Sequence, residues 1–389
     1  SGTGTNFSSL RSRHEKLSGG GTSSGLMSFL EVLDRGAGAT KSGGTTRRAA
    51  KMVCVDADHP EILDFVRWKS KEEEKARALI AAGWPADFNG EAYRTVAGQN
   101  ANNSVRVSDE FMEAALSGGS WETRHRTDGM VHRKLQASDL LDEIARAAWQ
   151  CADPGLQYHS TINNWDTCST TAPIRASNPC SEFMFLDDSG CNLASINLLK
   201  YVNEDGSFRV AEFEHAVRLL ITAQEILVDF SSYPTKDIAA NSHRFRPLGL
   251  GYAGLGAMLM GRGVPYDSDE GRGFCAAVTA LMTGRAYEVS AEIAGEKGPF
   301  EGYPANAEPF ARVMRQHQSA AAKIREGACP EELRQAAVDS WDRAVELGGR
   351  NGYRNSQTTV LAPTGTIGLL MDCETTGIEP DFALVKFKK

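Results

Sequence analysis

The sequence has no hydrophobic run long enough to cross a membrane and no cysteine pair spaced as C-x-x-C. Its most apolar stretch, residues 247–261, is interrupted by glycine and is shorter than the ~20 residues that a helix needs to span a bilayer. Its eight cysteines are scattered along 389 residues with no histidine at zinc-finger spacing, which argues against a structural zinc site or a disulfide scaffold. Nothing at the start resembles a secretory signal, so we expect a reducing, cytoplasmic compartment.

The sequence also has no excess of positive charge. Lysine and arginine number 42 against 50 aspartates and glutamates, which gives a formal net charge of −8, and the isoelectric point is near 5.6. Nucleic acid or an anionic membrane therefore has no basic surface to bind, and any phosphorylated ligand must be held by a local cluster. With 41 % hydrophobic and 24 % charged residues, the chain has the composition of an ordinary globular protein.

Strand-like and helix-like patterns alternate along the chain. The apolar run 52–55 precedes Asp58-His-Pro-Glu61, which predicts a helix capped by Asp58. Residues 104–107 and Ser108 repeat this order of strand, cap and helix. Further helices are expected over 140–149, 212–230, 250–260 and 273–294, with one or two within 307–347 and a β-rich run at 357–361. This alternation predicts a barrel-like or layered α/β architecture over 1–389, with no linker between domains.

A cysteine lies between an amide and a carboxyl residue in Ser177-Asn-Pro-Cys-Ser-Glu182. Cys180 is two residues from both Asn178 and Glu182, and a proline stiffens the turn, so a thiol, a carboxylate and an amide can meet at one point. These are the groups of a hydrogen-atom or proton-transfer site. Cys191 follows in the next stretch of chain. The alternative is that these cysteines are inert packing residues, and spacing alone does not decide between the two interpretations.

Glycine-rich segments provide further candidates. Ala362-Pro-Thr-Gly-Thr-Ile-Gly368 is either a turn that presents backbone N–H groups and hydroxyls to a phosphate or an ordinary strand-to-helix turn. Residues 16–22 and 41–48 are basic and rich in glycine, which is typical of nucleotide-wrapping loops and also of mobile, solvated loops. Residues 249–254 match G-x-G-x-x-G within a helical pattern, so we expect close helix packing there and not a dinucleotide site.

Four motifs together resemble the catalytic subunit of ribonucleoside-diphosphate reductase, most closely its class II, adenosylcobalamin-dependent type. They are Asn178-Pro-Cys-Ser-Glu182, Cys191-Asn-Leu-Ala-Ser-Ile-Asn-Leu198, Arg246-Pro-Leu-Gly-Leu-Gly-Tyr252 and Ala362-Pro-Thr-Gly-Thr-Ile-Gly-Leu-Leu-Met371. The resemblance implies a ten-stranded α/β barrel with a central finger loop, here as a partial catalytic barrel domain over 1–389. We expect both ends to be internal points of a longer polypeptide, so that the barrel is incomplete at both ends and the isolated chain is poorly stable and inactive.

The resemblance also implies a role for each motif. Cys180 would be the thiyl-radical site, Glu182 the general base for the 3′-hydroxyl proton, and Asn178 a hydrogen-bonding partner of the ribose. Cys191 would be one of two thiols that reduce the 2′ position and become a disulfide, and its partner would lie outside this chain. The residues implied to line the substrate are Gly4, Ser177, Pro179, Ser181, Pro363, Thr364, Gly365, Thr366 and Ile367.

The glycine-rich segments within 17–51 match the family's specificity loops, where a deoxynucleotide effector adjusts the choice of base. The residues expected to hold the effector are Lys16, Gly20, Gly21, Arg47 and Arg48. The implied reaction is reduction of ribonucleoside di- or triphosphates to 2′-deoxyribonucleotides for DNA synthesis. Adenosylcobalamin would be the cofactor and a thioredoxin-type dithiol the reductant, with no protein-held metal and a homodimer as one option for assembly. A class I subunit served by a separate radical-generating protein, a non-catalytic nucleotide-binding chain and a nicotinamide dehydrogenase are the alternatives.

Overall fold

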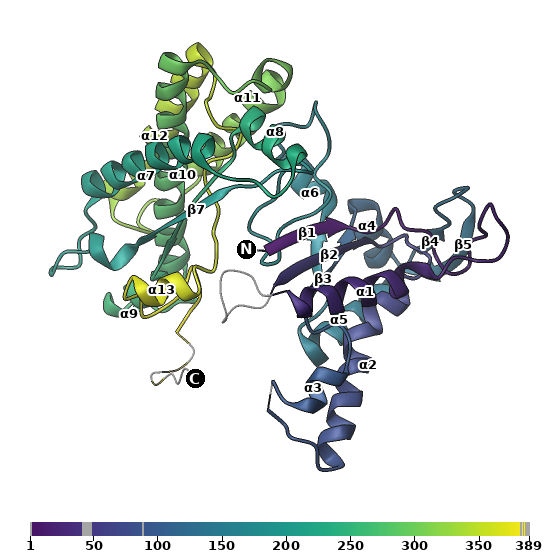
Figure 1. Cartoon of the computed structure of the whole chain (residues 1–389). Helices are drawn as coiled ribbons and strands as arrows, with labels where there is room; N and C mark the ends of the chain where they lie inside the picture. Colours follow the sequence, from purple (N-terminus) through teal and green to yellow (C-terminus); the bar gives the residue numbers. More distant parts are fainter. Residues whose placement is uncertain (1, 41–48, 88, 382, 384, 386–389) are drawn as a thin grey trace. The chain divides into compact units, whose positions relative to one another are not determined.

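The computed structural model describes residues 2–40, 49–87, 89–381, 383 and 385 (Figure 1). The chain divides into two compact units. Unit 1 contains Ser1–Asn164 and Ile174–Phe185, and unit 2 contains Trp165–Pro173 and Leu186–Lys389. Each unit has a hydrophobic core of its own.

Unit 1 is built on a four-stranded parallel sheet in the order β1-β2-β3-β6. The strands are β1 (Gly2–Asn6), β2 (Ala50–Asp56), β3 (Ala101–Val107) and β6 (Gly155–Tyr158). The helices are α1 (Gly25–Ala39), α2 (Ile62–Ala81), α3 (Glu91–Thr95), α4 (Asp109–Ser117), α5 (Ala137–Cys151) and α6 (His159–Asn164). A hairpin of β4 (Ser120–Arg124) and β5 (Val131–Gln136) connects α4 to α5 (Figure 1). Every connection between neighbouring parallel strands contains a helix, as the predicted α/β architecture requires.

The two predicted helix caps of unit 1 have different outcomes. Ser108 caps α4 as expected, because its Oγ accepts a hydrogen bond from Phe111 N at 3.3 Å. The predicted Asp58 cap of α2 is wrong, since Glu61 occupies the cap position and no side chain caps the helix. Asp58 instead pairs with Arg126, at 2.6 Å between Oδ1 and Nη2. A long-range ion pair has replaced the local bond that the sequence pattern favours.

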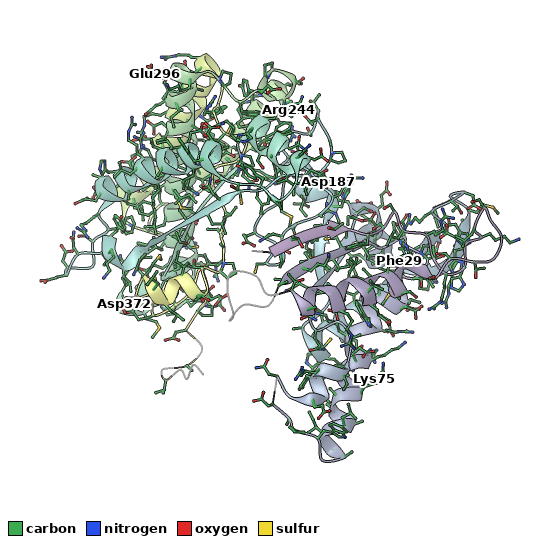
Figure 2. All side chains as sticks on the ribbon, viewed as in Figure 1. Phe29, Lys75, Asp187, Arg244, Glu296 and Asp372 are labelled. Carbon is green, nitrogen blue, oxygen red and sulfur yellow. The ribbon has the colours of Figure 1, made fainter. Side chains whose placement is uncertain are left out.

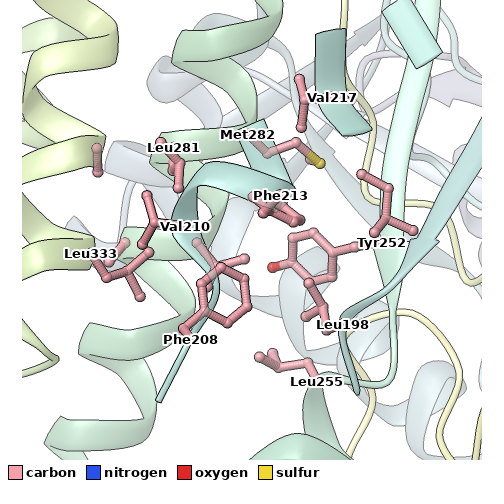
Figure 3. Packing of buried hydrophobic residues seen from close by; sticks show 14 of the residues in the cluster. Leu198, Phe208, Val210, Phe213, Val217, Tyr252, Leu255, Leu281, Met282 and Leu333 are labelled. Atoms are coloured by element: carbon pink, nitrogen blue, oxygen red, sulfur yellow. The ribbon is translucent and has the colours of Figure 1, made fainter. Parts of the chain in front are cut away.

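Unit 2 contains a parallel pair of strands, β7 (Asn192–Asn197) and β8 (Leu248–Ala253). Residues 357–360 extend the pairing through a bridge between Leu250 and Thr359. The helices are η1 (Leu198–Tyr201), α7 (Val210–Phe230), α8 (Lys236–Phe245), α9 (Leu255–Gly261), α10 (Asp269–Lys297), α11 (Tyr303–Ala321), α12 (Glu331–Asn351) and α13 (Thr366–Leu370). Helix α10 packs against α7 and α12, and Figure 3 shows Phe213, Tyr252 and Met282 meeting in the core.

The prediction of one helix over 250–260 is wrong in its first half, because β8 occupies that part and is buried along its whole length. Its glycines allow close approach of neighbouring backbone. A Cβ at Gly251 would lie 2.6 Å from Val360 O, and one at Gly249 would lie 2.6 Å from Leu193 Cδ2. The expected helix packing through these glycines is therefore corrected to strand packing.

The Arg246 motif begins with an ion-pair network in unit 2, in which Arg246 and Glu225 are buried. Arg246 Nε lies 2.7 Å from Glu225 Oε1, and its Nη1 lies 2.8 Å from Asp229 Oδ1. Glu225 also accepts hydrogen bonds from Arg354 Nε at 2.7 Å and from Asn355 Nδ2 at 2.6 Å. This motif thus joins α7, β8 and the segment before residue 357 in one polar cluster.

The expected ten-stranded barrel is not confirmed. In the part of the chain that the structure describes, the strands form one sheet of four and two pairs, and none of these sheets closes on itself. Strands β1 and β6 are the outer strands of the unit 1 sheet. A separate observation concerns membranes: among the described residues, no helix combines the length and apolar character needed for a membrane span.

Candidate active site

The predicted thiol segment, residues 177–182, forms a tight turn in unit 1 that we call the cysteine loop. Ser181 N donates to Asn178 O at 3.0 Å, and Phe183 N donates to Asn178 Oδ1 at 2.9 Å. Asn178 therefore closes the loop with both its main chain and its side chain. The turn leaves the Cys180 side chain exposed, which is the placement that a reacting thiol requires.

Strands β3 and β6 hold the base of the cysteine loop. Gln157 on β6 donates from Nε2 to Ser177 Oγ at 2.7 Å and to Ser181 Oγ at 3.2 Å. Its Oε1 accepts from Arg106 Nη1 on β3 at 2.9 Å. Both Gln157 and Arg106 are buried, where the loss of a hydrogen-bond partner is costly. Neither residue was predicted from the sequence, although Arg106 lies in the strand expected over 104–107, where a charged side chain is a usable signal.

Strand β1 contacts the cysteine loop through two glycines. Gly2 and Gly4 lie on one face of the strand because side chains alternate between faces. A Cβ at Gly4 would lie 1.6 Å from Ser177 O, and one at Gly2 would lie 2.5 Å from Pro179 Cγ. No side chain larger than hydrogen fits at Gly4 while the loop keeps this position. The structure thus brings the predicted residues Gly4, Ser177 and Pro179 together.

Glu182 carries an open acceptor. Its Oε2 is buried and has no hydrogen-bond partner among the described residues. A buried carboxylate oxygen without a donor is unfavourable unless another group supplies one. An unpaired acceptor two residues from an exposed thiol is suited to taking a proton from a hydroxyl group.

A second thiol, Cys54 on β2, lies close to Gln157, the residue that anchors the cysteine loop. Its Sγ is 3.5 Å from Gln157 Oε1. Burial raises the pKa of Cys54 to about 11, so the group stays a thiol at neutral pH and is a weak nucleophile. Cys54 therefore packs beneath the anchor, and we assign it no redox role.

Cys191 lies in unit 2, immediately before β7, and is half-buried. The next residue, Asn192, exchanges two hydrogen bonds with Gln224 of α7. Asn192 Nδ2 donates to Gln224 O, and Gln224 Nε2 donates to Asn192 O, each at 3.0 Å. These bonds fix the start of the strand beside Cys191. Cys180 belongs to unit 1, so each of the two predicted thiols is positioned by its own unit.

The predicted phosphate turn, residues 363–367, is also in unit 2 and is tied to β7. The hydroxyl oxygens of Ser195 and Thr364 are 3.0 Å apart. Gly365 N donates to Pro363 O at 2.7 Å. Thr364 and Gly365 have φ angles of 65° and 56°, in the region that glycine adopts most readily. The turn leads into α13, and its last three residues are exposed: Gly365, Thr366 and Ile367.

Part of the predicted effector segment forms a closed loop in unit 1. A bridge between Lys16 and Thr22 joins its two ends. Gly20 and Gly21 at its tip have φ angles of 93° and 83°, where glycine carries no steric penalty. Lys16 and both glycines are exposed. The remaining predicted effector residues lie outside the described residues: Arg47 and Arg48.

Comparison with known proteins relates the whole chain to one family. The family profile described as "Ribonucleotide reductase, barrel domain" matches residues 1–389. A vitamin B12-dependent ribonucleotide reductase of Rhodopirellula baltica is 54 % identical over 391 residues, which cover 100 % of this chain and 38 % of that protein. The protein of that name from Streptomyces avermitilis is 51 % identical over 394 residues, which cover 100 % of this chain and 41 % of that protein.

A more distant relative is the vitamin B12-dependent ribonucleoside-diphosphate reductase of Mycobacterium tuberculosis. It is 31 % identical over 384 residues, which cover 98 % of this chain and 46 % of that protein. The chain spans about two fifths of the length of the Rhodopirellula and Streptomyces relatives. Because the family profile covers it from end to end, the chain belongs to the ribonucleotide reductase barrel-domain family.

Proposed function

We propose that this chain carries out the reduction of ribonucleotides to 2′-deoxyribonucleotides, with adenosylcobalamin as the cofactor. The vitamin B12-dependent names of its relatives support this assignment. The observation that carries it is the cysteine loop. There an exposed Cys180 stands between Asn178, whose side chain is fixed, and Glu182, whose Oε2 is an open acceptor.

Cys180 fits a radical cofactor by its exposure. The chemistry that adenosylcobalamin supplies when bound is homolysis of its Co–C bond, which creates a carbon radical able to take a hydrogen atom from a thiol. Cys54 and Cys168 are each 0 % exposed, so neither presents its sulfur in this way. Cys180 would lose its hydrogen atom and then take the 3′-hydrogen of the ribose.

The neighbours of Cys180 would handle the substrate's hydroxyl groups. Glu182 Oε2 would accept the 3′-hydroxyl proton, for which its vacant acceptor position is suited. Asn178 uses its Oδ1 to accept from Phe183 N, which leaves its Nδ2 to donate to a ribose oxygen. Gly4 would line the ribose pocket beside Ser177, where a side chain would displace the loop.

Loss of the 2′-hydroxyl as water requires two electrons and two protons. Cys191 and a second thiol would supply them and become a disulfide, which a thioredoxin-type dithiol would reduce again. The turn at 363–367 would hold the substrate's phosphates through its backbone N–H groups. The Mycobacterium relative's name contains ribonucleoside-diphosphate, which favours a diphosphate substrate.

Regulation and assembly belong to the same proposal. The specificity loops within 17–51 would bind a deoxynucleotide effector and adjust the choice of base. Helix α1, which follows the first of these loops, leaves Phe29 48 % and Val32 69 % exposed. Figure 2 shows the Phe29 side chain on this helix. Exposed apolar residues on one helix support a homodimer joined through α1.

Among the alternatives, the relatives' names favour cobalamin over a class I subunit with a separate radical-generating protein. A nicotinamide dehydrogenase has no support from the G-x-G-x-x-G match, because Gly249 and Gly251 are packed inside β8.

The test is anaerobic freeze-quench EPR on the complete protein mixed with adenosylcobalamin, a ribonucleotide and a deoxynucleotide effector. We expect a signal in which a sulfur radical is coupled to cobalt, and we expect Cys180→Ala to abolish it. Cys151→Ala is the matched control, because Cys151 is a half-buried cysteine of unit 1 on α5. A folded protein that binds nucleotide and gives no signal would refute the proposal.

A further inference from the structure

A single buried carboxylate joins the β4–β5 hairpin to the segment before residues 16–22, which we call the effector loop. The Glu15 side chain is 1 % exposed. Its Oε2 accepts from Ser12 N at 2.6 Å, and its Oε1 accepts from Arg126 N at 2.7 Å. Oε1 also accepts from Thr127 N at 2.9 Å and from Thr127 Oγ1 at 3.0 Å. Three of these four bonds come from the turn of the hairpin, so Glu15 connects two distant segments of sequence.

The main chain of the same residue closes the effector loop. Glu15 N donates to Ser12 O at 3.1 Å, and Glu15 O accepts from Ser23 N at 2.9 Å. The bridge between Lys16 and Thr22 is the next pairing along the chain. A shift of Glu15 therefore moves the base of the loop that carries Gly20 and Gly21 at its tip.

The hairpin is itself anchored, so it can act as a support. Arg126 donates to both carboxylate oxygens of Asp58, at 3.1 and 2.6 Å. Arg124 N donates to Asp58 O at 2.8 Å. The far end of the effector segment is held by a second buried acid, because Leu26 N at the start of α1 donates to Glu61 Oε2 at 2.7 Å. Asp58 and Glu61, which hold the hairpin and the start of α1, both lie in the segment that precedes α2.

Three histidine rings pack beside the Glu15 carboxylate. His14 stacks on His132 with ring centroids 4.7 Å apart, and His125 meets His132 edge-on at 4.9 Å. His125 Nδ1 lies 3.9 Å from Glu15 Oε2. Among the described residues, no group of histidine, cysteine or acidic side chains is arranged to hold a metal ion. Burial alone would raise the pKa of Glu15, but the hydrogen bonds from Ser12 and Thr127 lower it to about 2, and the carboxylate stays charged.

We propose that Glu15 is a positioning residue for effector binding, through which the β4–β5 hairpin sets the shape of the loop at 16–22 that takes a deoxynucleotide. The inference rests on the proposed function, in which this loop is part of the effector site. Glu15 touches no nucleotide itself. Its effect on specificity passes through its main-chain bond to Ser23 and the bridge between Lys16 and Thr22.

The test compares three variants of the complete protein, with dATP and dTTP as probes in isothermal titration calorimetry. Glu15→Gln keeps the size of the side chain but turns an amide N–H₂ toward N–H donors. We expect it to weaken effector binding about tenfold, which corresponds to about 1.4 kcal/mol. Thr127→Val removes one of the four bonds and keeps the branched shape, and we expect about a threefold loss. Glu122→Gln is the matched control on the same hairpin, because Glu122 pairs only with the exposed Arg124 in the contacts described, and it should bind like the wild type.

A second readout separates positioning from general loss of structure. At saturating effector, the ratio of kcat/KM for two competing ribonucleotides should change in Glu15→Gln and stay constant in Glu122→Gln. If the wild type binds the probes and both Glu15→Gln and Thr127→Val keep wild-type affinity and selectivity, the inference is overturned and the proposed function stands. If the wild type binds neither probe, the assignment of the effector loop fails first, and the inference fails with it.

Discussion

Replacing Gly4 by alanine should displace the cysteine loop while leaving the protein folded. The added Cβ would lie 1.6 Å from Ser177 O, whereas carbon and oxygen atoms in contact are roughly 3.3 Å apart. The loop must therefore retreat by about 1.7 Å, and a misplacement of about 1 Å at a reacting group can cost about 100-fold in rate. The overpacking itself should cost about 1–3 kcal/mol of stability.

The assay is ribonucleotide reduction by the complete protein, with thermal unfolding measured in parallel. We expect kcat to fall by at least about 100-fold in Gly4→Ala. Gly2→Ala should have a smaller effect, because its Cβ would meet the side chain of Pro179 at 2.5 Å and not a backbone atom. Thr3→Ala on the opposite face of β1 is the matched control and should stay within about twofold of wild type. Turnover by Gly4→Ala within about threefold of wild type would show that β1 does not set the position of the loop.

Three further predictions concern Cys191, the Gln157 anchor of the cysteine loop and the half-buried His317. Cys191→Ser should leave hydrogen abstraction by Cys180 intact and block deoxynucleotide formation, and normal product yield with a dithiol reductant would remove Cys191 from its role. Gln157→Met should lower the free energy of unfolding by about 2–3 kcal/mol in urea titrations, because it removes an acceptor of the buried Arg106 guanidinium; an unchanged midpoint would mean that water replaces the amide. Burial lowers the pKa of His317 from its ordinary 6.5 to about 4, so the unfolded chain binds the proton more readily than the native state. The contribution of His317 to the free energy of unfolding is therefore complete above pH 6.5 and falls by about 2–3 kcal/mol toward pH 4.5. Urea midpoints measured for His317→Phe at several pH values should lack this part of the pH dependence.

Helices with a clear apolar period were predictable from the sequence. The expected helices at 140–149, 212–230 and 273–294 correspond to α5, α7 and α10. Where one or two helices were expected within 307–347, the structure has two, α11 and α12. Periodicity failed where the whole element is buried, because β8 has no exposed side to give it an alternating pattern. Apolar spacing is also no guarantee of burial, since Trp149 continues the spacing of α5 and is 86 % exposed.

The candidate site was only partly predictable. The thiol, amide and carboxyl of residues 177–182 are neighbours along the chain, so their grouping can be recognised from the order of the residues alone. Gln157, Arg106 and Glu15 act across long sequence separations, and nothing in the local pattern indicates which partner each will find. The contact between Gly4 and Ser177 is of the same kind. Local chemistry can therefore be predicted from the sequence, whereas the groups that hold it in place depend on the folded topology.

The glycines of β8 affect how a mutational scan of this protein should be interpreted. In a library selected for growth that depends on the proposed activity, positions 249 and 251 should be depleted of variants about as strongly as position 180. A scan that records only which positions tolerate no substitution would then assign both glycines to a nucleotide-binding site, since they satisfy a nucleotide-binding pattern. The cause is contact distance: only a hydrogen atom fits between Gly251 and Val360 O. Purified protein separates the two cases, because Cys180→Ser should yield folded, inactive enzyme, whereas Gly251→Ala should yield little folded enzyme at all.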